Sequence, residues 1–402
     1  SGPVLNTYSG YFTGTGTLAS VAFPGFTSAS GLSGAEFTDW AASISGPIML
    51  KDSAAAYAVN GTTITKITDA DYPALTVRGV QYLDGTFYVM EPDGTIWNST
   101  PASDDPQVWP SDGFLSAEFE PDTGVRLAKA LNYIVALGQW TTELFWDAAN
   151  STGSPLLPVN NGVLLIGCAH ANSVAQTEST IVWMAQRKAE NSTSHMGRFI
   201  AILVGTSYEE LSTPDVNRVL EADALTSVQA TIIELGGHSW YLLSLGASSI
   251  TLAFDMKNKL WYVWTRLAAG SPKTISGITQ TNGLATGTSA AHGFSDGDPI
   301  ILAGMTPAGY NGTLNVNVTG ANVFTYPVSA AINGTGTGAS MTATPYTESA
   351  FSLVASLGYN GQQVAMDLQG NMYTLSLGTA LDDGSIPLNW RIRTTSLDQG
   401  NV

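Results

Sequence analysis

LNYIVALGQWTTELFWD, residues 131–147, is the stretch that decides the fold. Its apolar residues form two short runs, 131–137 and 144–146, separated by a polar segment that begins at Gly138. Each run has the length of a strand, and its branched and aromatic side chains suit a pleated surface. Gly138 supplies backbone freedom where the chain reverses. We therefore predict a β-hairpin, and because the runs show little polar alternation, we expect similar sheets to cover both of its faces.

Composition sets wider limits on the fold. With 402 residues, the chain can hold one large all-β domain and a smaller one, or two or three ordinary domains. Hydrophobic residues make up 44% and charged residues 12%, so a disordered chain is not expected. No run approaches the roughly 18 apolar residues of a membrane helix, so we expect no membrane partner. Cys168 is the single cysteine, which excludes an internal disulfide and a cysteine-based metal cluster.

The formal net charge of −17 bears on possible partners. Proteins that grip nucleic acid do so with Lys and Arg, which release counterions from the phosphates. The acidic balance therefore disfavours tight DNA binding, although it is compatible with a wall past which DNA slides. Solubility alone also accounts for such a charge.

Hairpin signals recur along the chain. A plan of strand, turn and strand, with aromatic residues near the ends, repeats through 127–149, 181–212, 230–266 and 350–377. The dipeptides Asn-Gly and Asp-Gly, which tolerate the positive φ of tight turns, stand at 60–61, 84–85 and 93–94. About six such units of roughly 40 residues are the pattern of propeller blades. We predict an all-β fold, a β-propeller-like array of antiparallel meanders, with a sandwich stack as the alternative.

Two segments interrupt this repeat. Residues 213–225 begin with Thr213 as a helix N-cap and Pro214 at the first helical position, which predicts a short helix. Residues 276–345 are rich in Gly, Thr, Asn and Ala, and we expect a small β-domain inserted between blades. The predicted organisation is then a β/loop segment at 1–50, a propeller-like core at 51–275 and 346–402, and the insert.

Signals for catalysis or metal binding are weak. His170, His195, His238 and His292 stand far apart and form no metal-ligand motif, so we predict no metal, no cofactor and no catalytic residues. A propeller glycosidase, which would use paired carboxylates, is the enzymatic alternative. Carboxylates do pair in the sequence, mostly in turn-like settings, at 69 and 71, 104 and 105, 209 and 210, and 382 and 383. The eight arginines show no spacing typical of a carboxylate-binding site.

Several short motifs follow one another along the chain: ALNYIVALGQWTTELFWDAAN (130–150), IVWMAQR (181–187), GRFIAILVGTSYEELSTPDVNRVL (197–220), GGHSWYLLSL (236–245) and LAFDMKNKLWYVWTR (252–266). In the order of these motifs, the chain resembles the packaged-DNA stabilisation proteins of short-tailed bacteriophages, which are tail hub or nozzle subunits. The resemblance covers about residues 57–275 and resumes at 350–400. The C-terminal WRIRTTSLDQGNV resembles the start of a closing segment of that family.

The resemblance implies a structural rather than an enzymatic role. It implies a propeller subunit in a homo-oligomeric, hexameric ring below the phage portal and adaptor proteins, with a tail needle, fibre or tailspike protein as a further neighbour. The ring would retain packaged DNA and give the genome a channel that does not bind it specifically. The protein would then be a virion component of the phage tail, assembled in the bacterial host cytoplasm.

Particular residues are expected in the core or at contacts. We predict that 143–147 and 261–266 belong to the core and that the helix at 213–225 offers an interface. Trp140, in a turn, is expected in the core or at a contact, with the core favoured for a large aromatic. The insert is predicted to contact a neighbour or a fibre at the particle surface.

Overall fold

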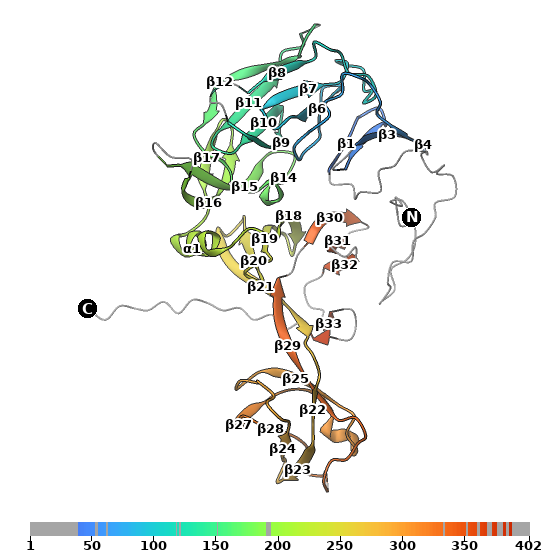
Figure 1. The fold of residues 1–402 in the computed structure, drawn as a ribbon, viewed down its shortest axis with the longest axis vertical. Helices are drawn as coiled ribbons and strands as arrows, with labels where there is room; N and C mark the ends of the chain where they lie inside the picture. The colour runs from blue at the N-terminus through green and yellow to red at the C-terminus, as the bar shows by residue number, and fades with distance from the viewer. Residues whose placement is uncertain are drawn as a thin grey trace, which may run out of the picture. The chain divides into compact units, whose positions relative to one another are not determined.

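The computed structural model describes residues 39–387 except for short gaps at 53–54, 62, 118, 120–121, 151, 190–193, 333, 351–352, 360–361, 368–371, 376–380 and 383–385 (Figure 1). Of the predicted N-terminal segment 1–50, residues 1–38 lie outside the described residues, and 39–50 contain β1 and most of β2. The chain after Pro387, including the predicted closing segment, also lies outside them. The described chain divides into two compact units. One contains the residues up to Val263 and those from Leu353 to Ile386, and the other contains 264–351.

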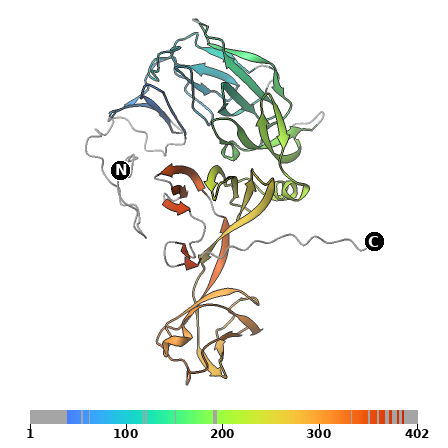
Figure 2. The ribbon, with the colours of Figure 1, turned by 180° about the vertical axis from the view of Figure 1, so that it is seen from behind.

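The first unit is built from antiparallel sheets that follow one another along the chain, as the colours of Figures 1 and 2 show. The first sheet consists of β1 (Asp39–Ala42), β2 (Ile48–Lys51), β3 (Ala56–Asn60) and β4 (Thr63–Lys66). The second consists of β5 (Gln81–Leu83), β6 (Thr86–Met90), β7 (Thr95–Asn98) and β8 (Phe114–Ser116). The third holds β9 (Gly124–Ala130), β10 (Tyr133–Gly138), β11 (Thr142–Asp147) and β12 (Leu156–Leu164). In each of these sheets the strands pair in sequence order, which is the meander of a propeller blade.

Three more sheets complete the described part of this unit. The fourth holds β13 (Gly167–Cys168), β14 (Ala175–Gln176), β15 (Ile181–Lys188), β16 (His195–Val204) and β17 (Ser207–Glu210). The fifth runs through β18 (Val228–Leu235), β19 (His238–Leu245), β20 (Ile250–Asp255) and β21 (Leu260–Ala269). The sixth holds β30 (Leu353–Tyr359), β31 (Gln362–Asp367) and β32 (Met372–Leu375), and a short pair joins β33 (Leu381–Asp382) to β34 (Ile386–Pro387). The predicted all-β propeller architecture is confirmed.

The hairpin predicted from 131–147 is β10 and β11, which pair from Tyr133 opposite Trp146 to Leu137 opposite Thr142. Alternate residues of β10 enter two different cores. Val135 packs in a cluster with Trp183 of the fourth blade, while Ile134 packs in a cluster with Tyr88 of the second. Both faces are therefore covered, as the lack of polar alternation predicts.

Successive blades are joined by such clusters. One cluster links the first and second blades, another the second and third, a third the third and fourth, and a fourth joins the fourth and fifth. The large aromatics Phe87, Phe145 and Phe254 are nearly fully buried in three of them. Burial of apolar side chains between sheets is thus the main force that stacks the blades.

The predicted Asp84-Gly85 turn has the expected geometry, whereas at 60–61 and 93–94 only the glycine has a positive φ, 58° and 91°. Asp84 and Gly85 both have positive φ, 46° and 84°, between β5 and β6. Gly236 and Gly237, between β18 and β19, also have positive φ, 64° and 75°. Two consecutive positive φ angles match the right-handed twist of the strands they join.

The predicted helix is α1 (Pro214–Ala222), which ends three residues before the predicted boundary. The Thr213 side chain accepts a hydrogen bond from the Val216 amide, as an N-cap should. Val216 and Leu220 are buried in the cluster between the fourth and fifth blades, so the inner face of α1 is part of the propeller core. The 3₁₀ turn η1 (Ala171–Ser173) lies in the fourth blade.

The second unit contains the predicted insert, 276–345. One of its sheets has the order β23 (Gly277–Thr281), β24 (Leu284–Thr288), β28 (Val323–Pro327) and β27 (Asn317–Gly320). The other consists of β22 (Lys273–Thr274), β25 (Pro299–Ala303), β26 (Gly312–Asn315) and β29 (Thr342–Ala350), with the 3₁₀ turn η2 (Ala308–Tyr310) beside it. Phe324 and Tyr326 of the first sheet share a core with Ile300 and Leu302 of the second, so this unit has a hydrophobic centre of its own.

Two core predictions were wrong in part. Within 143–147, Leu144 and Phe145 are buried, but Trp146 is 44% exposed. In 261–266, the side chains of 261–264 are half-buried or exposed, with Val263 46% exposed. Residues 261–264 belong to β21, which is the last strand of its blade and lacks the two-sided cover of an inner strand. Trp140 is half-buried, which fits either of the two roles predicted for it.

Candidate functional site: a polar cluster at the inner strands

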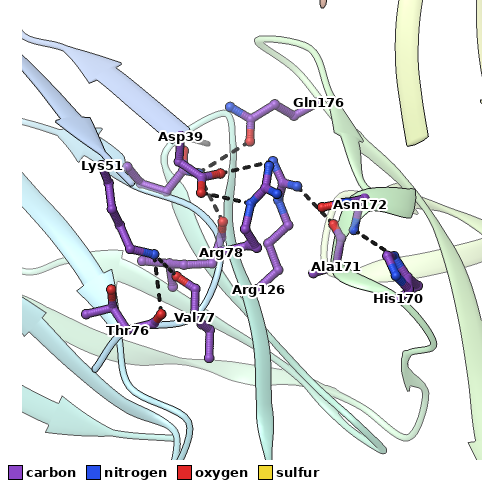
Figure 3. Close-up of polar contacts among 12 residues, drawn as sticks. Asp39, Lys51, Thr76, Val77, Arg78, Arg126, His170, Ala171, Asn172 and Gln176 are labelled. Carbon is purple, nitrogen blue, oxygen red and sulfur yellow. Dashed lines mark hydrogen bonds and ion pairs between the residues drawn. The ribbon is translucent and has the colours of Figure 1, made fainter. Parts of the chain in front are cut away.

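The first strands of the blades form the inner ring of the propeller. β1 contacts β5, β5 contacts β9, and β9, β14 and β18 follow in the same way, with β30 against β18. Arg78 and Arg126, near the starts of the second and third blades, form a parallel bridge in which the Leu127 amide donates to the Arg78 carbonyl oxygen at 2.9 Å. Polar side chains that meet at this ring form the candidate site, which Figure 3 shows.

Asp39 stands at the centre of the cluster. Its side chain is 3% exposed, and its Oδ2 lies 2.9 Å from Arg78 Nε while its Oδ1 lies 3.8 Å from Arg126 Nη2 (Figure 3). The three residues come from three consecutive blades. A buried charge costs several kcal/mol unless it is paired, so this carboxylate and the two guanidinium groups hold one another in place.

Lys51 lies opposite Asp39 across the β1–β2 pair and is also buried. Its ammonium group donates to the carbonyl oxygens of Thr76 and Val77, which precede the second blade (Figure 3). Burial lowers the pKa of Lys51 to about 8, and the nearby Asp39 carboxylate offsets part of that effect. The lysine therefore ties the first blade to the connection that enters the second.

The cluster extends into the fourth blade through Arg126. Its Nη1 donates to the Ala171 carbonyl oxygen at 2.9 Å, and burial lowers its pKa from the usual value. In the same turn, His170 Nδ1 accepts a hydrogen bond from the Asn172 amide at 3.1 Å. Burial, together with the positive charge of Arg78, lowers the pKa of His170. A neutral imidazole is what this cap needs, because a protonated Nδ1 could not accept the amide hydrogen.

Close backbone packing brings these groups together. Gly79 has φ +95°, and a Cβ built there would lie 1.9 Å from the Leu127 carbonyl oxygen. The same Leu127 oxygen accepts a hydrogen bond from Gln81 Nε2 at 3.1 Å. Only glycine allows the second and third blades to approach so closely at this point.

Further polar bonds continue around the inner ring. The Tyr241 hydroxyl, from the fifth blade, donates to the Ser173 carbonyl oxygen at 2.7 Å. Ser356 Oγ, in the sixth, donates to the Ile232 carbonyl oxygen in the fifth at 2.6 Å. The arrangement is a set of polar contacts between neighbouring blades, in which the charged groups pair with one another and with backbone carbonyls.

The four histidines serve separate local contacts. His195 Nε2 lies 2.9 Å from Glu221 Oε2, and His238 Nδ1 lies 2.7 Å from Asp255 Oδ2. His292 is buried in the second unit, where Nε2 donates to the Gly320 carbonyl oxygen and Nδ1 accepts from the Phe294 amide. Within the described residues, no group of three His, Cys, Asp or Glu side chains is placed to hold a metal ion.

The paired carboxylates of the glycosidase alternative are used in turns and surface contacts. Asp69 accepts from the amides of Asp71 and Trp109, and Asp105 accepts from the Gln107 amide. Glu210 lies 3.4 Å from Arg187 Nη2. The pair at 382 and 383 falls on side chains outside the described set. Local hydrogen bonding therefore accounts for the described pairs, as is usual for Asp in turns.

A small cavity between the second and third blades has a volume of about 10 Å³, roughly that of one water. Asp122 lines it, with one carboxylate oxygen accepting from the amides of Trp140 and Thr141. Its size excludes a sugar or any comparable substrate.

Sequence reasoning missed the Asp39 cluster. Asp39 falls in the predicted β/loop segment 1–50, and Arg78 and Arg126 are two of the eight arginines that show no typical spacing. The useful signal is the step of 42 or 43 residues between the first three inner strands, which begin at 39, 81 and 124, because these strands lie next to one another.

A helix that could span a membrane does not occur in the described part of the chain. A search of curated protein sequences found no match. Among solved structures, BamB from Moraxella catarrhalis aligns over 86% of this chain and 85% of its own, with 10% identity and a TM-score of 0.39. Saccharomyces cerevisiae Sqt1 aligns over 86% and 83%, with 9% identity and a TM-score of 0.41. Virginiamycin B lyase from Staphylococcus aureus aligns over 77% and 94%, with 11% identity and a TM-score of 0.36. Similarities this low carry no functional argument.

A sequence family gives the stronger result. The family described as Phage_stabilise, Bacteriophage P22 Gp10, beta-propeller, matches residues 25–287, which is more than half of the chain. The match spans the first five blades and the strands that carry the Asp39 cluster. With its stacked meanders tied at the inner ring, the chain belongs to this family of phage stabilisation proteins.

Proposed function

We propose that this chain is a structural subunit of a bacteriophage tail, a hub or nozzle below the portal and adaptor proteins. The subunits form a ring of about six copies that retains packaged DNA and provides the channel for its exit. The observation that carries the proposal is the family match across the propeller. Portal or adaptor proteins above the ring, and a needle, fibre or tailspike below it, are the proposed partners.

The packing of the propeller supports a mechanical role. Four hydrophobic clusters join the first five blades in sequence, and the Asp39 cluster links the first four of them at their inner strands. A load on one blade is therefore shared by its neighbours. Such a subunit resists deformation without any chemical step.

The charge of the chain supports a passive channel. A net charge of −17 repels phosphates, and the described Arg78, Arg126 and Lys51 are engaged by Asp39 and by backbone carbonyls. A DNA-binding surface would instead present free Lys and Arg side chains to the duplex. DNA would pass such a ring without being held by specific contacts.

Helix α1 is the proposed contact between neighbouring subunits. Its inner face is buried, whereas Pro214, Asp215, Arg218 and Glu221 are exposed on the other face. Arg218 Nη2 pairs with Asp215 along the helix, so the exposed face carries both charges. Charges arranged in this way favour one register against a complementary surface of the next subunit.

Electron microscopy of the protein mixed with purified portal–adaptor complexes tests this function. We expect rings to form on the complexes, on the side where the tail attaches. Failure to bind them, combined with binding or cleavage of a glycan, would overturn the proposal.

The contact through α1 has its own test. We expect Arg218→Glu to weaken ring assembly about tenfold or more, which corresponds to about 1.4 kcal/mol. The matched control Lys66→Glu reverses an exposed charge on β4, far from α1 in sequence, and should leave assembly unchanged. Equal assembly of the two variants would remove α1 from the interface while leaving the ring itself in place.

A further inference from the structure

One end of the third blade carries large apolar side chains that remain exposed. Trp146 lies opposite Tyr133 on β10 and opposite Leu157 on β12, so these side chains share a face at one end of the sheet. Trp146 is 44% exposed and Leu157 is 42% exposed, and Leu131, in the turn between β9 and β10, is 53% exposed. Exposed apolar side chains that gather in this way are typical of a protein interface.

Leu131 is also held in an unfavourable backbone conformation. Its φ is +52°, in a region that residues with a large side chain rarely adopt. The Leu131 amide donates to the Glu178 carbonyl oxygen of the fourth blade at 2.9 Å, which fixes this turn. Backbone strain that leaves an apolar side chain exposed points to a functional contact.

The charges beside these apolar side chains are negative. Asp147 directly follows Trp146, and Glu178 is an exposed neighbour of Leu131. Lys129, which interacts electrostatically with Glu178, is half-buried and donates to a backbone carbonyl oxygen. A surface complementary to this one would combine Lys or Arg with an apolar side chain. We call the surface formed by the five residues Leu131, Trp146, Asp147, Leu157 and Glu178 the acidic rim.

The turn between β20 and β21, in the fifth blade, presents the opposite chemistry. Lys257 and Lys259 are exposed there, and the next residue, Leu260, is 53% exposed. The buried Asp255 carboxylate holds the turn by accepting from the amides of Lys257 and Asn258 at 2.9 and 3.2 Å. The turn is therefore preorganised to present two ammonium groups beside an apolar side chain.

The acidic rim and this turn lie two blades apart. In a propeller of about six blades, two steps around the axis turn a surface by about 120°. The two neighbours of a subunit in a ring of about six copies are separated by about the same angle, seen from that subunit. Val216 of α1 and Phe254 of β20 share a hydrophobic cluster, so the proposed α1 contact and the β20–β21 turn belong to the same side of the subunit. This arrangement suits a head-to-tail contact.

We propose that the β20–β21 turn of one copy docks on the acidic rim of the next copy of this chain. Leu260 packs on the apolar side chains of the rim, while Lys257 and Lys259 pair with its two carboxylates. Within its own subunit Lys259 Nζ lies 4.0 Å from Glu209 Oε2, and an exposed pair of this kind is weak enough to be exchanged. Such a contact presupposes the proposed ring, to which it adds a second interface between subunits.

Charge reversal in the full-length protein tests the contact. We expect Glu178→Lys and Lys257→Glu each to weaken ring assembly about tenfold, because each places like charges together. Mass photometry with and without portal–adaptor complexes measures this loss. The double variant exchanges the two charges and should restore assembly. The matched control Asp71→Lys reverses an exposed carboxylate outside both surfaces and should leave assembly unchanged.

The outcomes separate this contact from the ring itself. Wild-type rings together with unaffected single variants, a double variant as weak as the singles, or an equal loss in Asp71→Lys would overturn the contact and leave the ring in place. A wild-type protein that forms no ring under either condition would overturn both.

Disulfide crosslinking gives an independent readout. We expect Leu157→Cys combined with Leu260→Cys, oxidised with copper phenanthroline, to give a ladder of covalent oligomers up to the size of the ring. The matched control Leu157→Cys alone should stay monomeric on the gel, because Cys168 is buried. Dimers without larger species would indicate a two-fold contact. That result, a bond within one chain, or no crosslink would contradict the proposal.

Discussion

Asp39 links residues that are distant in the sequence. The carboxylate lies in β1, Arg78 enters the second blade, and Arg126 belongs to the third, so one buried side chain joins three blades. Lys51 sits opposite Asp39 and binds the connection to the second blade. At this scale the inner strands are held by ion pairs around one buried carboxylate, whose charge water screens only weakly.

Replacing Asp39 should lower the free energy of unfolding, because it removes the buried ion pairs with Arg78 and Arg126. Asp39→Asn removes the negative charge and leaves Arg78 and Arg126 without their counterion, which should cost about 3 kcal/mol of unfolding free energy. Urea unfolding measures this loss. The matched control Asp215→Asn removes an exposed ion pair with Arg218 and should cost less than about 1 kcal/mol. Equal costs for the two variants would show that Asp39 is not a tie between blades.

His170 should make stability depend on pH. The pKa of His170 is lowered below 6.5 in the folded protein by burial and by Arg78. Between that folded value and 6.5, the unfolded chain binds more protons, so stability falls as pH falls through this window. His170→Asn keeps an acceptor for the Asn172 amide but does not titrate. We expect urea midpoints of the wild type to drop more than those of the variant as pH is lowered below 6.5, and parallel profiles would contradict this role.

At the scale of the element, blades are defined by what covers their two faces. β10 divides its side chains between two clusters, whereas β21 ends its blade and leaves Val263 46% exposed. Helix α1 occurs where the chain leaves the fourth blade, and its buried Val216 and Leu220 fill the space before the fifth. The position of a strand within its blade therefore decides burial more strongly than its composition does.

The approach between the second and third blades depends on Gly79. Gly79→Ala places a methyl group 1.9 Å from the Leu127 carbonyl oxygen, so the inner strands must move apart. We expect a loss of about 3 kcal/mol in urea unfolding, as for an overpacked contact. Gly61 also has positive φ, +58°, but a Cβ there meets nothing within 4 Å. Gly61→Ala should therefore cost only about 1 kcal/mol, and a similar loss in both variants would contradict the close approach.

Local signals in the sequence were sufficient for many elements. The hairpin of β10 and β11, the Asp84-Gly85 turn and the Thr213 cap follow from short-range preferences that act within a few residues. The Asp39 cluster could not be found in this way, because it joins residues 39, 78 and 126 through the packing of three consecutive blades. The exposure of Trp146 and Val263 depends equally on which blade lies outside each strand.

At the scale of the whole molecule, the chain is a propeller with an inserted β unit, and it belongs to a family of phage stabilisation proteins. Hydrophobic clusters join its first five blades in sequence, and the charged side chains of the Asp39 cluster pair across blades. These features suit a rigid part of a larger assembly. The proposed ring follows from repeating one contact, between two different surfaces of the subunit, around a closed axis.

The mass of the assembled protein tests the central claim most directly. Mass photometry of the full-length chain, alone and with portal–adaptor complexes, counts the subunits in each particle. The proposed tail hub predicts a closed ring of about six copies, formed alone or on the complexes. A protein that stays monomeric under both conditions would contradict it.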